Sequence, residues 1–291
     1  MKRGLLFAFS ALCLCPFTKG HSLPNNPEII SGSASTRFQG NTLEVRPSDQ
    51  AILDFDHFCI APEETVRFVQ TSKDAAVLSR IRSRDPTAIL GRLESNGRVF
   101  LVAPSGLYFG REATVNVGSL IASTLEIHKD DFLDKNYTFY ETGTKAALCN
   151  LGTLISDEGS IALVSHQIYN SGTIVAELGS VSLVSGDKVT LDFEGDGLMR
   201  FSLEGPWAEV GERSNQGALA MRPSDAKRAL EALVNIDGVE EGEVFTLENG
   251  VIRLLPSSRV KAQELHLNGP DLSVSGKARA ISNHGLGGKV Q

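Results

Sequence analysis

The sequence contains few cysteines and few aromatic residues. The low aromatic content suits a fold with many tight turns and small stacked side chains. Only 7% of its 291 residues are aromatic, and there are four cysteines in all. Two of these, Cys13 and Cys15, lie in an apolar stretch at the N-terminus, so the chain cannot depend on a dense disulfide framework. We expect the other two, Cys59 and Cys149, to be free buried thiols, because a small thiol packs as an ordinary apolar group. A single disulfide between them is the alternative.

Basic residues are also scarce. The chain has 28 Lys and Arg against 35 Asp and Glu, a net charge of −7. Without Lys2, Arg3 and Lys19 in the first twenty residues, the balance is 25 against 35, or −10. Nucleic-acid binding depends on Lys and Arg that neutralise phosphates. We therefore expect no nucleic-acid partner and no docking on an anionic membrane.

Long apolar runs are missing except at the N-terminus. Residues 5–15 are apolar, follow Lys2 and Arg3, and precede a segment that ends in small residues before His21. This order is typical of a secretory signal peptide, and eleven residues are too few to cross a bilayer. We expect a signal peptide at 1–20 and a mature domain at 21–291. The mature domain would pass through the periplasm and be secreted or held at the cell surface.

No short motif assembles a catalytic or metal site. The six histidines lack His-x-x-x-His and Glu-x-x-His spacings, and there is no phosphate-binding loop. Asp54 and Asp56 alternate on one predicted strand and fit a solvated face better than a carboxylate pair. Asp192, Glu194 and Asp196 lack the spacing of a calcium loop. The sequence therefore predicts no catalytic residue, no metal site and no cofactor, and it does not favour an enzyme.

Two adjacent segments instead repeat one pattern with a period of twenty residues. Residues 150–165 and 170–185 are identical at eight of sixteen positions, among them Asn150 and Asn170, Gly152 and Gly172, and Leu163 and Leu183. Short β-branched runs at a fixed period are typical of a solenoid, whereas hairpin turns, the alternative, need no constant offset. The sequence predicts an all-β fold, a right-handed parallel β-helix. In it, Leu154 stacks on Ile174, Ile161 on Val181 and Leu163 on Leu183, at about 4.7–4.9 Å.

The rest of the chain divides around these coils. We expect an N-terminal capping region at about 28–70, core coils at about 96–200 and looser coils at about 201–291. In the looser part, 234–239 and 247–252 look like further coils. Residues 223–234 predict a short helical excursion that packs on the side of the solenoid, with a partner-binding helix as the alternative. Residues 281–291 repeat the pattern in part, and an unpaired strand edge there predicts self-association through the C-terminal coil.

A further set of motifs precedes the repeat. Asn96 and Gly97 mark one turn, Pro104, Ser105 and Gly106 form a second, and Leu107, Phe109 and Gly110 follow. Together with matching segments over about 28–200, this order resembles the N-terminal haemagglutination-activity domain of filamentous haemagglutinin-like exoproteins, the secreted partners of two-partner secretion systems. The family's turn reads Asn-Pro-Asn-Gly-Ile, whereas this chain has Ala at 103 and Ser105 in place of the two Asn. We expect Ser105 to bond nearby backbone weakly.

The resemblance implies a secretion and folding module of an adhesin-like exoprotein. It implies that an outer-membrane β-barrel transporter recognises the domain, and that the domain nucleates the β-helix as it emerges. The residues implied in this recognition include the hallmark turn and its neighbours: Asn96, Gly97, Pro104, Ser105, Gly106, Leu107, Phe109 and Gly110. A host-surface ligand is a further expected partner. Two alternatives stay open: a small β-helical carbohydrate-active enzyme, and a free-standing surface structural protein.

Overall fold

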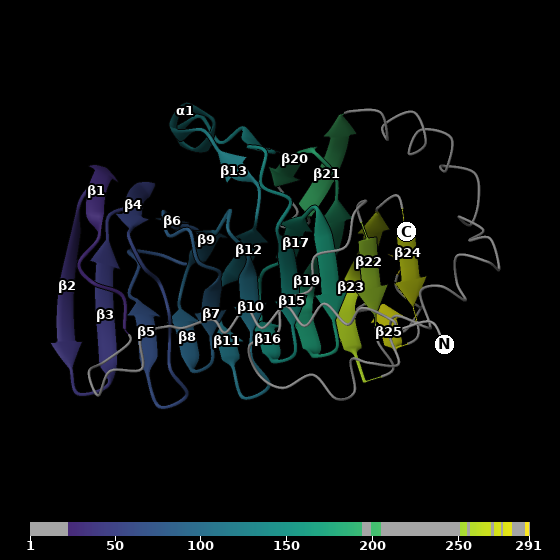
Figure 1. Ribbon diagram of the computed structural model, residues 1–291, viewed down its shortest axis with the longest axis horizontal. Coiled ribbons are helices and arrows are strands. Elements are labelled where there is room, and N and C mark those ends of the chain that lie inside the picture. The colour runs from purple at the N-terminus through teal and green to yellow at the C-terminus, as the bar shows by residue number, and fades with distance from the viewer. Residues whose placement is uncertain are drawn as a thin grey trace, which may run out of the picture.

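The computed structural model describes residues 23–193, 199–204, 251–254, 257–268, 271–274, 276–280 and 289–290. Within these residues the chain winds as a stack of coils, and each coil places successive strands on three faces (Figure 1). Strands on one face pair in parallel with the equivalent strands of the coils before and after. The predicted parallel β-helix is confirmed. The predicted signal peptide, the helix at 223–234, the coil at 234–239 and most of the C-terminal repeat lie outside the described residues.

The three faces are named by the order in which the chain reaches them. The first face contains β3 (Thr42–Pro47), β5 (Thr65–Phe68), β8 (Arg92–Ser95), β11 (Thr114–Asn116), β16 (Thr153–Ser156) and β25 (Lys277–Ala280). The second face contains β4 (Ala51–Phe55), β6 (Ala76–Ile81), β9 (Arg98–Val102), β12 (Ser119–Ser123), β17 (Ile161–Ser165) and β26 (Lys289–Val290). Two long strands run along both of these faces, β19 (Thr173–Ser185) and β23 (Arg259–Asn268).

The third face is a separate parallel sheet. It contains β7 (Thr87–Ile89), β10 (Leu107–Phe109), β15 (Ala147–Asn150), β18 (Gln167–Asn170), β22 (Val251–Leu254) and β24 (Asp271–Val274). The predicted coil at 247–252 ends in β22, whose register sets Ile252 on Ile168. The parallel stack therefore continues beyond the twenty-residue repeat.

The register predicted from the repeat is confirmed. Leu154 pairs with Ile174 on the first face, and Leu163 pairs with Leu183 on the second. Because the side-chain period of a strand is two, this register turns every second residue into the solenoid. One such inward column runs through Val99, Leu120, Ile161 and Val181, and all four are fully buried in one continuous core.

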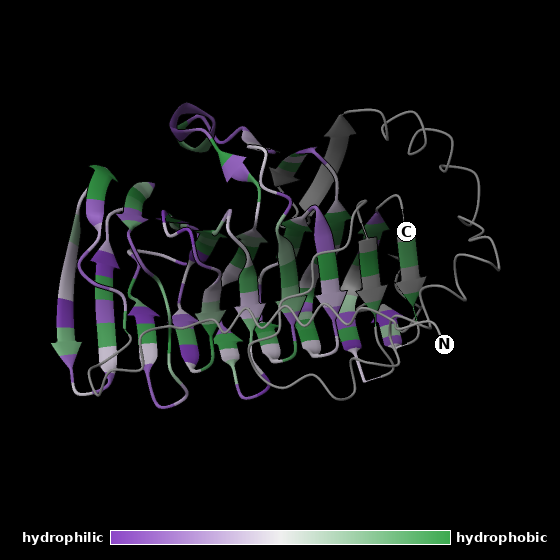
Figure 2. Ribbon diagram, viewed as in Figure 1, coloured by the Kyte–Doolittle hydropathy of each residue, from purple (hydrophilic) through white to green (hydrophobic). Residues whose placement is uncertain are grey.

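The second face is also buried on its outer side, which the sequence analysis did not anticipate. An antiparallel sheet covers it, formed by β13 (Glu126–Ile127), β14 (Tyr137–Tyr140), β20 (Lys188–Phe193) and β21 (Met199–Glu204). The only helix among the described residues, α1 (Lys129–Leu133), lies between β13 and β14. Its ribbon is coloured mostly as hydrophilic in Figure 2. We call these five elements the outer layer. Strands buried on both sides become nearly continuous apolar runs, as in the Val-Phe-Leu-Val of β9.

The N-terminal end of the stack is closed by two antiparallel strands. β1 (Glu28–Ser31) pairs with β4, and β2 (Ala34–Gln39) pairs with β3. Parallel stacking begins directly afterwards, since β3 already pairs with β5. Within the predicted capping region of 28–70, the antiparallel elements therefore occupy only its first part.

Two corners of the solenoid are lined by columns of glycine. A Cβ on Gly159 would lie 2.0 Å from the carbonyl oxygen of Gly118, and a Cβ on Gly172 would lie 2.1 Å from that of Gly152. One column separates the first and second faces, and the other separates the third and first: Gly97, Gly118, Gly159 and Gly179, then Gly91, Gly110, Gly152 and Gly172. At most of these positions the nearest atoms are backbone of the preceding coil, so an added side chain would push the coils apart.

The stacked leucines give the first prediction. Leu183→Ala should lower the free energy of unfolding by about 2–5 kcal/mol, because it leaves a cavity above the fully buried Leu163. Leu178→Ala on the same strand is the matched control, since Leu178 is 51% exposed and should change stability by less than about 0.5 kcal/mol. Chemical denaturation measures both. Equal midpoints for the two variants would refute the assigned register.

The glycine columns give a second prediction. Gly159→Ala should destabilise the fold by about 2 kcal/mol or more, because the added methyl overlaps backbone that cannot rotate away. Gly40→Ala is the control: its Cβ would meet nothing within 4 Å, and only its φ of +58° carries a penalty, about 1–2 kcal/mol. A thermal melt in which Gly159→Ala costs no more than Gly40→Ala would contradict close packing at the corner.

Candidate functional site: coil corners and the outer layer

The hallmark turn lies at the corner between the second and third faces. Gly106 donates a backbone hydrogen bond to the carbonyl of Ala103 at 3.0 Å, which closes the turn around Pro104 and Ser105. Gly106 has a φ of +120°, a region that residues with a Cβ rarely adopt. The turn expected around Pro104 and Gly106 is therefore present.

Ser105 bonds backbone, as expected, but its partner belongs to the preceding coil. Its hydroxyl does not bond its own turn but donates to the carbonyl of Ser83, at 2.7 Å, in the preceding coil. The bond therefore ties one coil to the next, and it is part-buried. A serine is long enough for this contact because the two turns lie directly over each other.

The residues that follow the turn point into the core or line a corner. Leu107 and Phe109 are buried in the central cluster, and Leu107 pairs in register with Thr87 and Leu148. A Cβ on Gly110 would lie 2.7 Å from a methyl carbon of Leu90. These three residues shape the coil and present no side chain to a partner.

Asn96 and Gly97 lie at a different corner, between the first and second faces. The Asn96 amide bonds both backbone groups of Gln70 in the preceding coil: its oxygen accepts from the N–H at 2.8 Å, and its nitrogen donates to the carbonyl at 2.9 Å. A Cβ on Gly97 would lie 2.7 Å from the Gln70 side chain. Since β9 separates this corner from the hallmark turn, the structure does not bring the two motifs into one patch.

The repeated asparagines form a buried ladder on the third face. Asn150 and Asn170 are in register and fully buried, and the Asn150 amide donates to the Asn170 side-chain oxygen at 2.7 Å. Each side chain also bonds the glycine two residues later, Gly152 by its N–H at 3.1 Å and Gly172 by its carbonyl at 3.2 Å. Buried amides persist only when they are paired in this way. The repeat residues therefore stabilise the corner.

The outer layer docks through aromatic packing. Phe100 on β9 packs edge-on against Phe132 of α1, with ring centroids 5.2 Å apart. It also packs against Tyr137 of β14 in a tilted arrangement, with centroids 4.8 Å apart. Gln50 fixes the far end of α1 by donating to the carbonyl of Leu133 at 2.9 Å. The outward apolar residues of β9 and β12 were the sequence signal for this layer.

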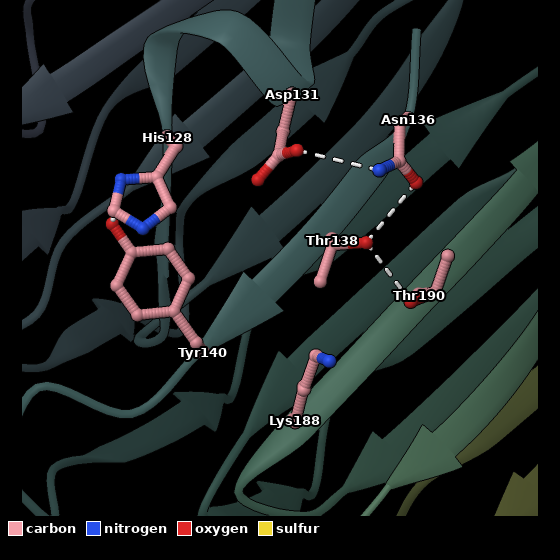
Figure 3. Close-up of a pocket in the computed structure, with 7 residues that line it drawn as sticks. All are labelled: His128, Asp131, Asn136, Thr138, Tyr140, Lys188 and Thr190. Atoms are coloured by element: carbon pink, nitrogen blue, oxygen red, sulfur yellow. Dashed lines mark hydrogen bonds between the residues drawn. The ribbon is translucent and has the colours of Figure 1, made fainter.

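A shallow depression crosses the exposed side of the outer layer (Figure 3). His128 stacks on Tyr140 with ring centroids 4.1 Å apart, and the Tyr140 hydroxyl lies 2.9 Å from the His128 Nδ1. Thr138 bonds Thr190 at 3.0 Å across β14 and β20. The other lining residues are Asp131, Asn136 and Lys188. Six of these seven residues hydrogen-bond one another, as is usual on a solvated protein surface.

Asp54 is engaged in an ion-pair network. Arg80 donates to both of its carboxylate oxygens, at 2.6 and 3.0 Å, and Arg82 donates to one of them at 2.9 Å. Arg82 also reaches Glu126 of the outer layer at 3.0 Å. Burial raises the pKa of Glu126, while Arg82 and Arg80 act in the opposite direction. Both carboxylate oxygens of Asp54 are thus bound by arginines, and Asp54 has a structural role. Asp56, the other member of the carboxylate pair considered above, is exposed.

Three potential metal ligands converge elsewhere, although no short motif predicts them. The ligand atoms of Glu141, His166 and Asp187 all lie within 4.8 Å of one another. Of the acidic triplet considered in the sequence, Glu194 and Asp196 fall outside the described residues.

Cys59 and Cys149 do not pair with each other. Cys149 is a free thiol, as predicted, and burial raises its pKa to about 12. The state expected for Cys59 stays a prediction, because its surroundings include residues outside those that the structure describes.

Among the described residues, no helix is long and apolar enough to cross a membrane.

Known proteins share this architecture. The structure resembles the crystal structure of the HMW1 secretion domain from Haemophilus influenzae, with a TM-score of 0.61 and 26% sequence identity, over 90% of this chain and 60% of that one. Two heme/hemopexin-binding proteins of Haemophilus influenzae are similar in sequence. One is 26% identical over 116 residues, which is 39% of this chain, and the other is 30% identical over 92 residues, which is 32%.

Those matches span only 13% and 10% of the two relatives' own lengths, so the likeness concerns one part of much longer proteins. The sequence also matches the family described as the TPS secretion domain over residues 17–263, most of its length. The coil-stacked fold and this match agree with the two-partner secretion domain that the combined motifs over about 28–200 resemble. The chain therefore belongs to the TPS secretion domain family, the secretion modules of two-partner secreted exoproteins.

Proposed function

We propose that this chain is the export-directing and fold-nucleating module of an adhesin-like exoprotein of the filamentous haemagglutinin type. In this proposal an outer-membrane β-barrel transporter recognises it after it crosses the periplasm. The observation that carries the proposal is the parallel β-helix closed at its N-terminal end by β1 and β2, in a chain that matches a secretion family. A capped first coil gives the following coils an edge to build on.

The hallmark residues support a role in coil-by-coil folding. Asn96 and Ser105 each bond backbone of the coil before them, at Gln70 and Ser83. A chain that emerges N-terminus first can make these bonds as soon as each corner is complete. We infer that the hallmark turns act in secretion by locking a new coil onto its predecessor, rather than through one continuous contact patch.

The first prediction of this proposal concerns export. Residues 1–20 should be required for it, and the exported protein should begin near His21, because the basic, apolar and small-residue order matches a signal peptide. N-terminal sequencing of the exported protein checks the cut. Soluble protein that keeps Met1 and stays in the cytoplasm would overturn the prediction.

The second concerns the corner bonds. Asn96→Ala should lower stability by about 1–3 kcal/mol, because it leaves the Gln70 backbone groups without the amide. It should also reduce the amount secreted by cells that express the transporter. Asn116→Ala, on the exposed side of β11, is the matched control and should secrete and unfold as the unmodified chain does.

Immunoblots of medium and periplasm measure secretion, with and without the transporter. Accumulation in the periplasm without the transporter, and in the medium with it, is the expected pattern. Equal amounts in the medium in both strains would refute recognition by a transporter, whatever the stability of Asn96→Ala.

A further inference from the structure

Three polar side chains meet where the outer layer leaves the solenoid. Glu141 directly follows β14, Asp187 lies in the turn between β19 and β20, and His166 lies between β17 and β18. Their ligand atoms lie within 4.8 Å of one another. Two of them belong to the edges of the outer layer and one to the corner of a coil.

Hydrogen bonds to the backbone of these residues hold all three in place. The Glu141 N–H donates to the carbonyl of Asp187 at 2.8 Å, and the Ser185 hydroxyl donates to the carbonyl of His166, also at 2.8 Å. Ser185 itself is stacked in register on Ser165, the residue before His166. The cluster is therefore held by sheet and corner hydrogen bonds that do not involve the side chains that converge.

Buried polar atoms at this site lack hydrogen-bond partners, and a bound cation could take their place. The His166 side chain is only 6% exposed, and neither ring nitrogen has a hydrogen-bond partner. The facing Oδ1 of Asp187 is also buried without one. The His166 Nδ1 and the Asp187 Oδ1 are close enough for an ion pair but make no hydrogen bond, and a cation bonded to both would satisfy them.

The spacing fits a metal ion. The Nδ1 of His166 and the Oδ1 of Asp187 are 3.3 Å apart. Two ligands of a tetrahedral ion with bonds of about 2.0–2.2 Å lie roughly 3.3–3.6 Å apart. Asp187 and Glu141 are part-exposed, so their carboxylates have room to rotate and complete the site.

The ligand set selects the class of ion. Mg²⁺ and Ca²⁺ favour sites made of oxygen atoms, whereas imidazole with carboxylates suits Zn²⁺ and neighbouring divalent transition metals. Three protein ligands leave a fourth position for water. We propose that Glu141, His166 and Asp187 bind one divalent transition-metal ion, which clips the outer layer to the coil beneath it.

A titration of the purified exported chain, without an affinity tag, tests the site. After treatment with a chelator and dialysis, the protein is titrated with ZnCl₂ by calorimetry and with CaCl₂ for comparison. We expect one Zn²⁺ per chain, no comparable Ca²⁺ binding, and a higher melting temperature with Zn²⁺ because the ion binds the folded state. Visible absorption with Co²⁺ in place of Zn²⁺ reports the coordination geometry.

Variants assign the ligands. Asp187→Asn and Glu141→Gln keep side-chain size, remove a part-exposed charge and should each weaken Zn²⁺ binding at least 10-fold and abolish the rise in melting temperature. Asp157→Asn, an exposed carboxylate in the turn between β16 and β17, is the matched control and should bind as the unmodified chain does. Testing the two carboxylates keeps the result readable even if a change at the buried His166 prevents folding.

Three results would overturn the proposal. They are no Zn²⁺ binding at all, binding that both carboxylate variants leave unchanged, and binding of several ions that the control reduces equally. Each readout uses the purified chain alone, so none depends on the transporter or on secretion.

Discussion

Direct backbone contact between successive coils is the constraint on which the rest of the structure depends. The parallel strands set the coil spacing, and the glycine columns at two corners let the turns approach as closely as the strands do. Every other feature follows from that fixed spacing. It aligns the inward leucine columns, puts Asn150 within reach of Asn170 and allows Ser105 to bond the coil below.

The sequence revealed this spacing only where two coils have equal length. Residues 160 and 180 are bonded across twenty residues, and the repeat there predicted register residue by residue. One coil earlier, Ser160 bonds Ser119 across 41 residues, because α1 and its flanking strands are inserted between β12 and β15. An insertion destroys the period without changing the stack. The outer layer was therefore missed, although the unbroken apolar run of β9 carried its signal.

Some candidate site residues could be found from the sequence, whereas others are brought together only by the fold. The hallmark residues were found because a family resemblance identifies short motifs, but their bonds to Gln70 and Ser83 depend on which turns stack, and only the fold decides that. Glu141, His166 and Asp187 come from three segments that no spacing rule connects.

The antiparallel strands β1 and β2 give the stack a direction. They occupy the edges that β4 and β3 would otherwise offer to an earlier coil, so new coils can be added only toward the C-terminus. In the proposed export by a transporter, each coil that folds outside the cell stacks on the coil before it. The free energy of that stacking would oppose backward sliding, so that folding of the chain would help to drive its own export.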